Sequence, residues 1–291
     1  MIYEIENEFI KVGVETLGAQ PVSIFRKNGN IEHLWQGDEK FWKGRCPHLF
    51  PIVGRLYEGK YSYNGKEYSM NPHGFARKSE FTLVEKNSDS MTFALSASDK
   101  TKEEYPFDFI FMVKYAIAKN TLTMTYIVEN VGNDVMYFGL GGHPGFNVPF
   151  DGGDFTDYYV EAAQPCKPVQ LLLSPSYLMS EDRRNLPLEN DRILRLKHEL
   201  FDNDAIVSEG FAKTVAIKSD KTDKSIVVSF PEANYLGLWH ATATQAPFLC
   251  IEPWENLPSF DGKIEKLNEK PHIGKLNAGE TYESPITITL G

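Results

Sequence analysis

Alternation of apolar and polar residues is the dominant pattern in this 291-residue chain, and it limits the possible folds more than any other feature. Successive side chains of an extended strand point to opposite faces, so strict alternation indicates a strand with one buried face. Residues 9–15 (FIKVGVE) and 91–96 (MTFALS) show the pattern clearly. Further segments of this kind are 80–85, 107–118, 121–130, 135–141, 156–161, 191–197, 211–218, 224–230, 234–239, 247–252 and 281–289. The chain is therefore expected to be rich in β-strands.

Two turns are predicted to join such segments into hairpins. Residues 60–70 (KYSYNGKEYSM) form the clearest one, because Asn64-Gly65 supplies the two positive-φ positions of a tight turn between strands that carry tyrosines. The two longest alternating segments are joined at Lys119-Asn120. There we expect Asn120 to take the left-handed conformation, which asparagine tolerates.

Helical patterns are few and short. They cover residues 39–42, 101–104, 198–202 and 265–269. No segment of linker composition divides the chain, and the longest weakly patterned run, 174–191, is followed directly by strand-like sequence. The sequence therefore predicts one all-β domain over residues 1–291, a large β-sandwich of two sheets.

The charge and the hydropathy of the chain exclude several classes of partner. Lys and Arg total 30 against 40 Asp and Glu, a formal net charge of −10, whereas sequence-independent binding to nucleic acid or to an anionic membrane needs a basic surface. No apolar run approaches the roughly 18 residues of a spanning helix, and the N-terminal segment lacks the features of a signal peptide. Cys46, Cys166 and Cys250 are odd in number and far apart, which argues against a disulfide framework. We expect a cytoplasmic protein.

Common catalytic motifs are missing. Residues 54–60 (GRLYEGK) match the start of a phosphate-binding loop, but Tyr61 stands where magnesium binding needs Ser or Thr. The flanking pattern is also that of a hairpin rather than of a strand, a loop and a helix. There is no GxSxG, HExxH or GxGxxG motif, so the hydrolase, metalloprotease and dinucleotide-binding hypotheses have no support in the sequence.

Five polar residues stand at predicted strand ends or in loops: Arg55, His73, His143, Asp204 and Glu252. His143 lies among glycines (GLGGHPGFN) that let backbone or ligand approach closely. Glu252 ends an apolar strand, where partial desolvation would raise the pKa of its carboxyl group toward a range useful for proton transfer. Taken singly, each residue also has a structural interpretation, as an ion-pair, turn or capping residue. No HxH or HxxxH pair is present to begin a metal site, so no metal is expected.

Taken in chain order, the motifs resemble those of a known superfamily. They are Arg55, HGFAR at 73–77, GGHPGFN at 141–147, NDA at 203–205 and CIEPW at 250–254. Together they resemble the aldose 1-epimerase (galactose mutarotase-like) superfamily, and most closely the mutarotase-like proteins of bacterial sugar operons. The resemblance extends from about residue 2 to residue 289. It implies a β-supersandwich with an open carbohydrate cleft, in agreement with the strands expected above.

The resemblance also implies an activity, the interconversion of the α and β anomers of a hexose. Glu252 would be the general base that removes the proton from the C1 hydroxyl, and His143 the general acid that protonates the ring oxygen. His73 and Arg55 would hold the sugar, and Asp204 would accept hydrogen bonds from its hydroxyls. Nothing is oxidised and no group is transferred, so no cofactor is expected, and the expected partner is a small sugar.

The identity of the sugar depends on Arg77. HGFAR also resembles the hexose-6-phosphate 1-epimerases, in which the extra arginine helps to hold the phosphate, and arginine is suited to bidentate phosphate binding. Arg55 or Lys78 would then assist. Three alternatives stay open: an epimerase for free aldoses, an epimerase for sugar phosphates, and a non-catalytic sugar-binding protein on the same fold. The sequence leaves the oligomeric state open.

Four further residues near these motifs receive expectations. Trp254 and Phe146 are candidates for stacking on the apolar face of the sugar, with core packing as the alternative. His48 lies close to Arg55 in the sequence and is a candidate for the cleft lining. Cys250, beside the proposed base, is expected to be a small buried core residue rather than a nucleophile.

Overall fold

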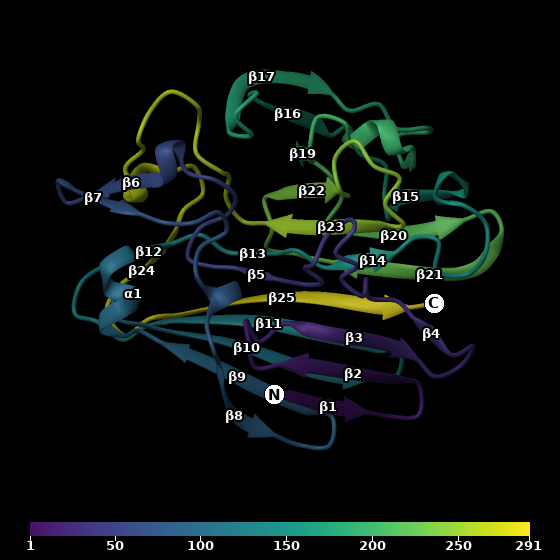
Figure 1. Ribbon diagram of the computed structural model, residues 1–291, viewed down its shortest axis with the longest axis horizontal. Helices are drawn as coiled ribbons and strands as arrows, with labels where there is room; N and C mark the ends of the chain where they lie inside the picture. The colour runs from purple at the N-terminus through teal and green to yellow at the C-terminus, as the bar shows by residue number, and fades with distance from the viewer.

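Two large β-sheets stacked on one another form the body of the molecule in the computed structural model, which describes all residues 1–291 (Figure 1). Both sheets are antiparallel. Across the nine-stranded sheet the order is β18 (Ile193–Arg195), β15 (Tyr158–Ala162), β20 (Thr214–Ser219), β21 (Thr222–Ser229), β25 (Thr281–Leu290), β11 (Thr121–Asn130), β10 (Phe109–Ala118), β9 (Ser90–Ser96) and β8 (Thr82–Lys86). Across the eight-stranded sheet it is β17 (Met179–Asn185), β16 (Val169–Leu173), β19 (Ile206–Glu209), β22 (Tyr235–Trp239), β23 (Phe248–Trp254), β13 (Gly141–Gly142) and β5 (His48–Leu49), with β14 (Gly145–Asn147) also pairing with β23.

Smaller elements complete the chain. A four-stranded sheet packs on the nine-stranded one, where Tyr3 contacts Phe93, and two short hairpin-like pairs lie at the end of the sandwich (Figure 1). The strands of these sheets are β1 (Ile2–Glu6), β2 (Ile10–Glu15), β3 (Pro21–Arg26), β4 (Ile31–Glu32), β6 (Lys60–Tyr63), β7 (Lys66–Ser69), β12 (Met136–Phe138) and β24 (Gly274–Leu276). The helical elements are α1 (Asp99–Glu104) and 3₁₀ turns at Tyr57–Gly59, Ala76–Lys78, Phe155–Asp157, His198–Phe201 and Leu267–Glu269. None of these helices is long and apolar enough to cross a membrane.

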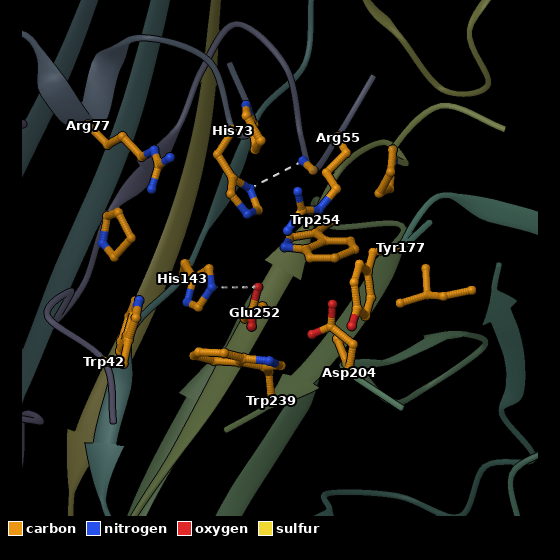
Figure 2. A pocket seen from close by; sticks show the side chains of 16 residues that line it. Trp42, Arg55, His73, Arg77, His143, Tyr177, Asp204, Trp239, Glu252 and Trp254 are labelled. Atoms are coloured by element: carbon orange, nitrogen blue, oxygen red, sulfur yellow. Dashed lines mark hydrogen bonds and ion pairs between the residues drawn. The ribbon is translucent and has the colours of Figure 1, made fainter. Parts of the chain in front are cut away.

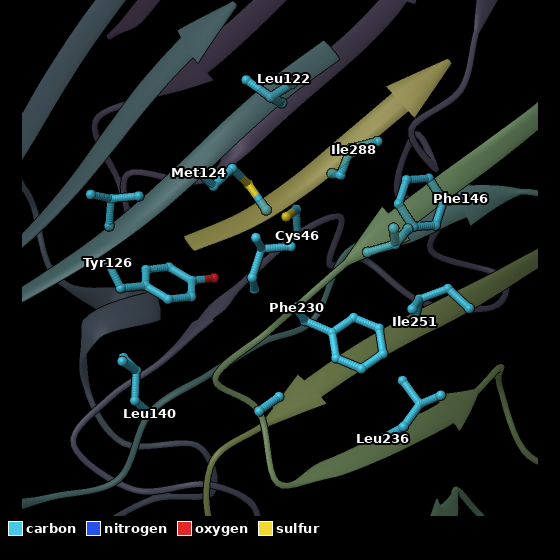
Figure 3. Close-up of a cluster of buried hydrophobic side chains, with 14 of the residues drawn as sticks. Cys46, Leu122, Met124, Tyr126, Leu140, Phe146, Phe230, Leu236, Ile251 and Ile288 are labelled. Carbon is cyan, nitrogen blue, oxygen red and sulfur yellow. The ribbon is translucent and has the colours of Figure 1, made fainter. Parts of the chain in front are cut away.

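The main core lies between the two large sheets (Figure 3). Leu122 and Met124 of β11 and Ile288 of β25 lie on one side of it, and Leu236 of β22 and Ile251 of β23 on the other. β11 alternates between buried and half-buried side chains along its whole length, as the period-two pattern predicts. In contrast, every residue of β23 is buried, because this strand has the core on one face and a second layer of side chains on the other. The prediction of an all-β sandwich is confirmed.

One predicted turn is confirmed and the other is corrected. Asn64 and Gly65 have φ values of 49° and 76°, and they connect β6 to β7 as expected. In the turn between β10 and β11, Lys119 takes the left-handed conformation, with a φ of 52°, and Asn120 does not. The side chain of Asn120 donates a hydrogen bond to the carbonyl oxygen of Leu290 at 2.6 Å. Asn120 therefore links this turn to the neighbouring strand β25.

Three local expectations are wrong. Residues 39–42 form a turn rather than a helix, in which the amides of Phe41 and Trp42 both donate to the carbonyl oxygen of Asp38. The weakly patterned run 174–191 contains a full strand, β17, which pairs with β16. The predicted strand 135–141 is interrupted between β12 and β13, because the amide of Gly139 donates to Pro51 instead of to a ladder partner.

Candidate active site

A hollow of about 320 Å³ lies on the outer face of the eight-stranded sheet, over β23 (Figure 2). Seven residues singled out in the sequence line it: Arg55, His73, Arg77, His143, Asp204, Glu252 and Trp254. Nine others complete the lining: Trp42, Pro47, Gly54, Pro72, Leu173, Tyr177, Ala205, Trp239 and Pro258. The fold thus brings the candidate residues together from segments far apart in the chain. A mixture of aromatic walls and a few convergent polar groups is typical of a small-molecule site.

β23 places Glu252 on the floor of the hollow. Leu249 and Ile251 of this strand point into the main core, so the alternation of side chains directs Glu252 and Trp254 to the opposite face. The side chain of Glu252 is almost fully buried. Burial raises the pKa of its carboxyl group well above the usual value, and the nearby carboxylate of Asp204 raises it further. Glu252 therefore holds a proton more readily than an exposed carboxyl group does.

His143 lies directly beside Glu252, with its Nε2 3.3 Å from a carboxylate oxygen, Oε2. The preceding glycines allow this approach: a Cβ on Gly142 would lie 2.8 Å from Ile286 Cδ1 and 2.9 Å from the hydroxyl of Tyr126. Burial lowers the pKa of the His143 imidazole to about 3. Because burial disfavours the charged form of both groups, the pair shares one proton over a broad pH range.

His73 has a defined protonation state. Its Nδ1 accepts a hydrogen bond from the amide of Gly54 at 3.2 Å, so the ring proton of the neutral form is on Nε2. Burial lowers the pKa of His73 well below its usual value, and the neighbouring His143 lowers it further. The backbone there is tightly constrained, since His73 and Gly74 both have positive φ, 65° and 72°. His73 is therefore a neutral hydrogen-bond donor.

Two other lining residues also take the left-handed conformation, Tyr177 with a φ of 58° and Asp204 with a φ of 72°. Each such residue costs on the order of 1–3 kcal/mol, and such costs concentrate at functional sites. Burial raises the pKa of Asp204, while a hydrogen bond from Trp239 and the charge of Arg55 oppose this change. His73, Tyr177 and Asp204 thus all have strained backbone, which supports the hollow as a functional site.

The two arginines lie on the same side of the hollow as His73, one on either side of it (Figure 2). The guanidinium of Arg55 is exposed and lies over the ring of Tyr177, 5.4 Å from its centroid. Arg77 is half-buried, and its Nε has no hydrogen-bond partner. Burial lowers the pKa of Arg77. Both side chains are thus available to a ligand.

Three aromatic residues of the lining were not predicted from the sequence: Trp42, Tyr177 and Trp239. The Trp42 ring stacks on His143 at a centroid distance of 4.9 Å, and Trp239 meets His143 edge-on at 5.6 Å. Trp239 ends a predicted strand, and that position is the one signal that could have identified it. Trp42 and Tyr177 lie in segments without strand pattern, so nothing in the sequence indicates where their rings point.

Three secondary expectations are corrected. Phe146 is fully buried in the main core (Figure 3) and does not line the hollow. His48 is also inside the core, with Nδ1 2.9 Å from the hydroxyl of Tyr126 and Nε2 2.7 Å from that of Tyr115. Lys78 lies outside the hollow lining. Phe146 and His48 are on short strands whose two faces cannot be assigned from so few residues.

Cys250 lies near His143 and Glu252. It offers its sulfur within 4.8 Å of ligand atoms of His143 and Glu252, so the three residues could in principle hold a metal ion. A cysteine ligand must be a thiolate. Burial raises the pKa of the Cys250 thiol well above its usual value, and the adjacent Glu252 raises it further. This environment fits a packed thiol, as the sequence analysis expects, better than a metal ligand.

The fold and the hollow together define an all-β enzyme-like protein with a buried carboxyl–imidazole pair in an aromatic cleft. The family model described as aldose 1-epimerase matches residues 1–289. The chain therefore belongs to the aldose 1-epimerase family, a family of isomerases.

Relatives and solved structures agree with this assignment. Protein LacX of Lactococcus lactis subsp. lactis is 32% identical over 300 residues, which cover 100% of this chain and 99% of that protein. A galactose mutarotase related enzyme from Lactobacillus acidophilus has a TM-score of 0.95 and 32% identity, with 100% and 97% of the two chains covered. A galactose mutarotase-like protein from Lactobacillus casei has a TM-score of 0.93 and 28% identity, with both chains covered completely.

Proposed function

We propose that the protein interconverts the α and β anomers of a free hexose in this hollow, with Glu252 as general base and His143 as general acid. The observation that carries the proposal is the contact of 3.3 Å between Glu252 Oε2 and His143 Nε2 at the floor of the hollow. The C1 hydroxyl and the ring oxygen O5 of a pyranose are bonded to the same carbon. Two proton-exchanging groups that lie side by side can therefore reach both atoms.

The reaction balances with the one proton that the pair shares. Glu252, as carboxylate, takes the proton of the C1 hydroxyl, while His143, as imidazolium, gives its proton to O5 and the C1–O5 bond breaks. The product is the open-chain aldehyde, and both side chains are now neutral. Burial favours the neutral pair, with the proton on Glu252. The reactive ion pair therefore forms when this proton moves from Glu252 to His143, and the first step restores two neutral groups. Rotation about C1–C2 and reversal of both transfers close the ring as the other anomer.

The remaining polar groups are assigned to binding. Nε2–H of His73 donates to a sugar oxygen, Arg55 donates from the same side, and the carboxylate of Asp204 accepts from hydroxyls. Trp254 and Trp239 lie on either side of Glu252 in Figure 2 and offer apolar surface to the pyranose. None of these contacts needs a cofactor.

Polarimetry on freshly dissolved α-D-glucose and α-D-galactose tests the proposal. The wild-type protein should accelerate mutarotation, and Glu252→Gln should lose most of this activity, by about 10²–10⁴-fold. Sugar binding should persist in Glu252→Gln, as measured by the fluorescence of the tryptophans in the hollow. A wild-type rate no faster than buffer, for free and phosphorylated hexoses alike, would instead identify a non-catalytic sugar-binding protein.

A second candidate, a hexose 6-phosphate as substrate, is favoured by one observation. Arg77 lines the hollow with an unpartnered Nε, and its charge is partly desolvated. Such a group gains most from an anionic ligand. Arg77→Ala should then raise KM for a hexose 6-phosphate and barely change KM for the free sugar. Equal effects on both substrates would count against phosphate recognition.

A further inference from the structure

The imidazole of His143 is held in an unusual way. Nε2 faces Glu252, but Nδ1 is buried and has no hydrogen-bond partner. A histidine that exchanges protons is commonly oriented by a hydrogen bond at its second nitrogen. Here aromatic rings surround it instead. Trp42 stacks on its face at 4.9 Å and 25°, while Trp239 and His73 each meet it edge-on at 5.6 Å and 79°.

Several contacts hold Trp42 and its indole ring in place. The backbone carbonyl of Trp42 accepts a hydrogen bond from Nε1 of Trp35 at 2.8 Å, and the Trp42 amide donates to the carbonyl oxygen of Asp38 at 2.9 Å. Gly44 passes directly against the ring, where a Cβ would lie 2.4 Å from Cζ2 of Trp42. The ring also stacks on Phe248 at 5.6 Å. The indole is thus held by several contacts before any ligand binds.

We propose that Trp42 is a positioning residue for His143: its indole face keeps the imidazole in line with Glu252 and stabilises the positive charge that the ring carries while it is protonated. The mechanism above needs such a charge in a buried place, and this inference rests on that proposed function. A cation over an indole face is stabilised most strongly when both are desolvated. The other titratable groups around the ring are Glu252 and Cys250 of β23 and, from the segment 73–77, His73 and Arg77.

Two substitutions separate the aromatic contact from mere bulk. Trp42→Leu removes the aromatic face, and Trp42→Phe keeps one. The matched control is Phe41→Leu on the same loop, because Phe41 packs edge-on against Trp35 at 6.2 Å rather than on His143. Kinetics are measured by polarimetry on α-D-glucose as a function of pH, and urea unfolding reports the stability of each variant. The ¹⁵N resonances of the His143 ring, followed without sugar from neutral pH into the acid range, report the pH at which the ring takes its proton and need no turnover.

The attraction between the Trp42 indole face and the protonated His143 ring determines the expected results. Trp42→Leu should reduce kcat about tenfold or more with KM changed less than about twofold, and Trp42→Phe should recover much of the loss. Because Trp42 stabilises the protonated ring, its removal should lower the pH at which the ¹⁵N resonances change from neutral imidazole to imidazolium. An unchanged titration of the His143 ring in Trp42→Leu, or an equal change in Phe41→Leu, would overturn the inference. A wild type without mutarotase activity would defeat the proposed function alone, since the resonances still decide the role of Trp42.

Discussion

Replacing Gly74 by alanine puts a methyl group where the backbone leaves no room. A Cβ at this position would lie 2.2 Å from the carbonyl oxygen of Phe50 and 2.7 Å from the nitrogen of Pro51. Both are backbone atoms of the segment that precedes Arg55, so neither can rotate away. Gly65, in the turn of the β6–β7 hairpin, has nearly the same φ, 76° against 72°, and a Cβ there meets nothing within 4 Å. The two positions therefore differ in the space available for a methyl group, whereas their φ values are nearly the same.

The two substitutions should therefore differ by the cost of the steric overlap. An alanine in the left-handed conformation costs about 1–2 kcal/mol at either site. Overpacking at a site that cannot relax adds about 1–3 kcal/mol, which applies to Gly74 alone. Gly74→Ala should then lower the free energy of unfolding by about 2–5 kcal/mol, and Gly65→Ala by no more than about 2 kcal/mol.

Urea unfolding followed by tryptophan fluorescence measures both changes, provided that the slope with denaturant stays constant. Gly74 also adjoins His73, so the affinity for sugar should fall in the folded Gly74→Ala variant and stay unchanged in Gly65→Ala. Equal destabilisation by the two substitutions would refute the argument that Gly74 is required for space.

Two further predictions concern buried ionisable groups. Lys270 donates to Glu265 Oε2 at 2.6 Å and to Ser259 Oγ at 3.2 Å, with both charges almost fully buried; Lys270→Met should cost about 3–5 kcal/mol of unfolding free energy, and adding Glu265→Leu should recover most of it. A single variant as stable as the wild type would contradict this. Burial raises the pKa of Glu255 from 4.5 to about 7, so the folded state binds a proton that the unfolded state has released. The stability of the wild type relative to Glu255→Gln should fall by about 3 kcal/mol as pH rises from about 4.5 to 7, whereas a pH-independent difference in urea unfolding would show that Glu255 titrates normally.

The strands could be predicted where one face is buried and the pattern is long. β10 and β11 are identified within two residues, because each is a long segment rich in β-branched, aromatic and other apolar residues, and its side chains alternate in burial over ten residues. β17 was missed because its last five residues are all exposed, so no apolar face is visible in the sequence. Pairing order could not be predicted at all, since β25 lies between β11 and β21 and its pairing with β11 joins residues separated by more than half of the chain.

In the hollow too, some residues could be predicted from local sequence and others depend on tertiary packing. Glu252 and His143 could be singled out because unusual neighbours surround them, an apolar strand in one case and four glycines in the other. Their separation of 3.3 Å follows from the pairing of β13 and β14 with β23, which no local pattern encodes. Trp42 was invisible because its role depends on where a loop places one ring. Tertiary packing decides such positions, and residue type does not.

A crystal structure of Glu252→Gln with a bound hexose would test the central claim most directly. The account predicts that the C1 hydroxyl lies about 3 Å from the side-chain oxygen or nitrogen of residue 252, with O5 at a similar distance from Nε2 of His143. A sugar bound in the hollow with C1 directed away from both side chains, toward Arg77 or the solvent, would contradict it.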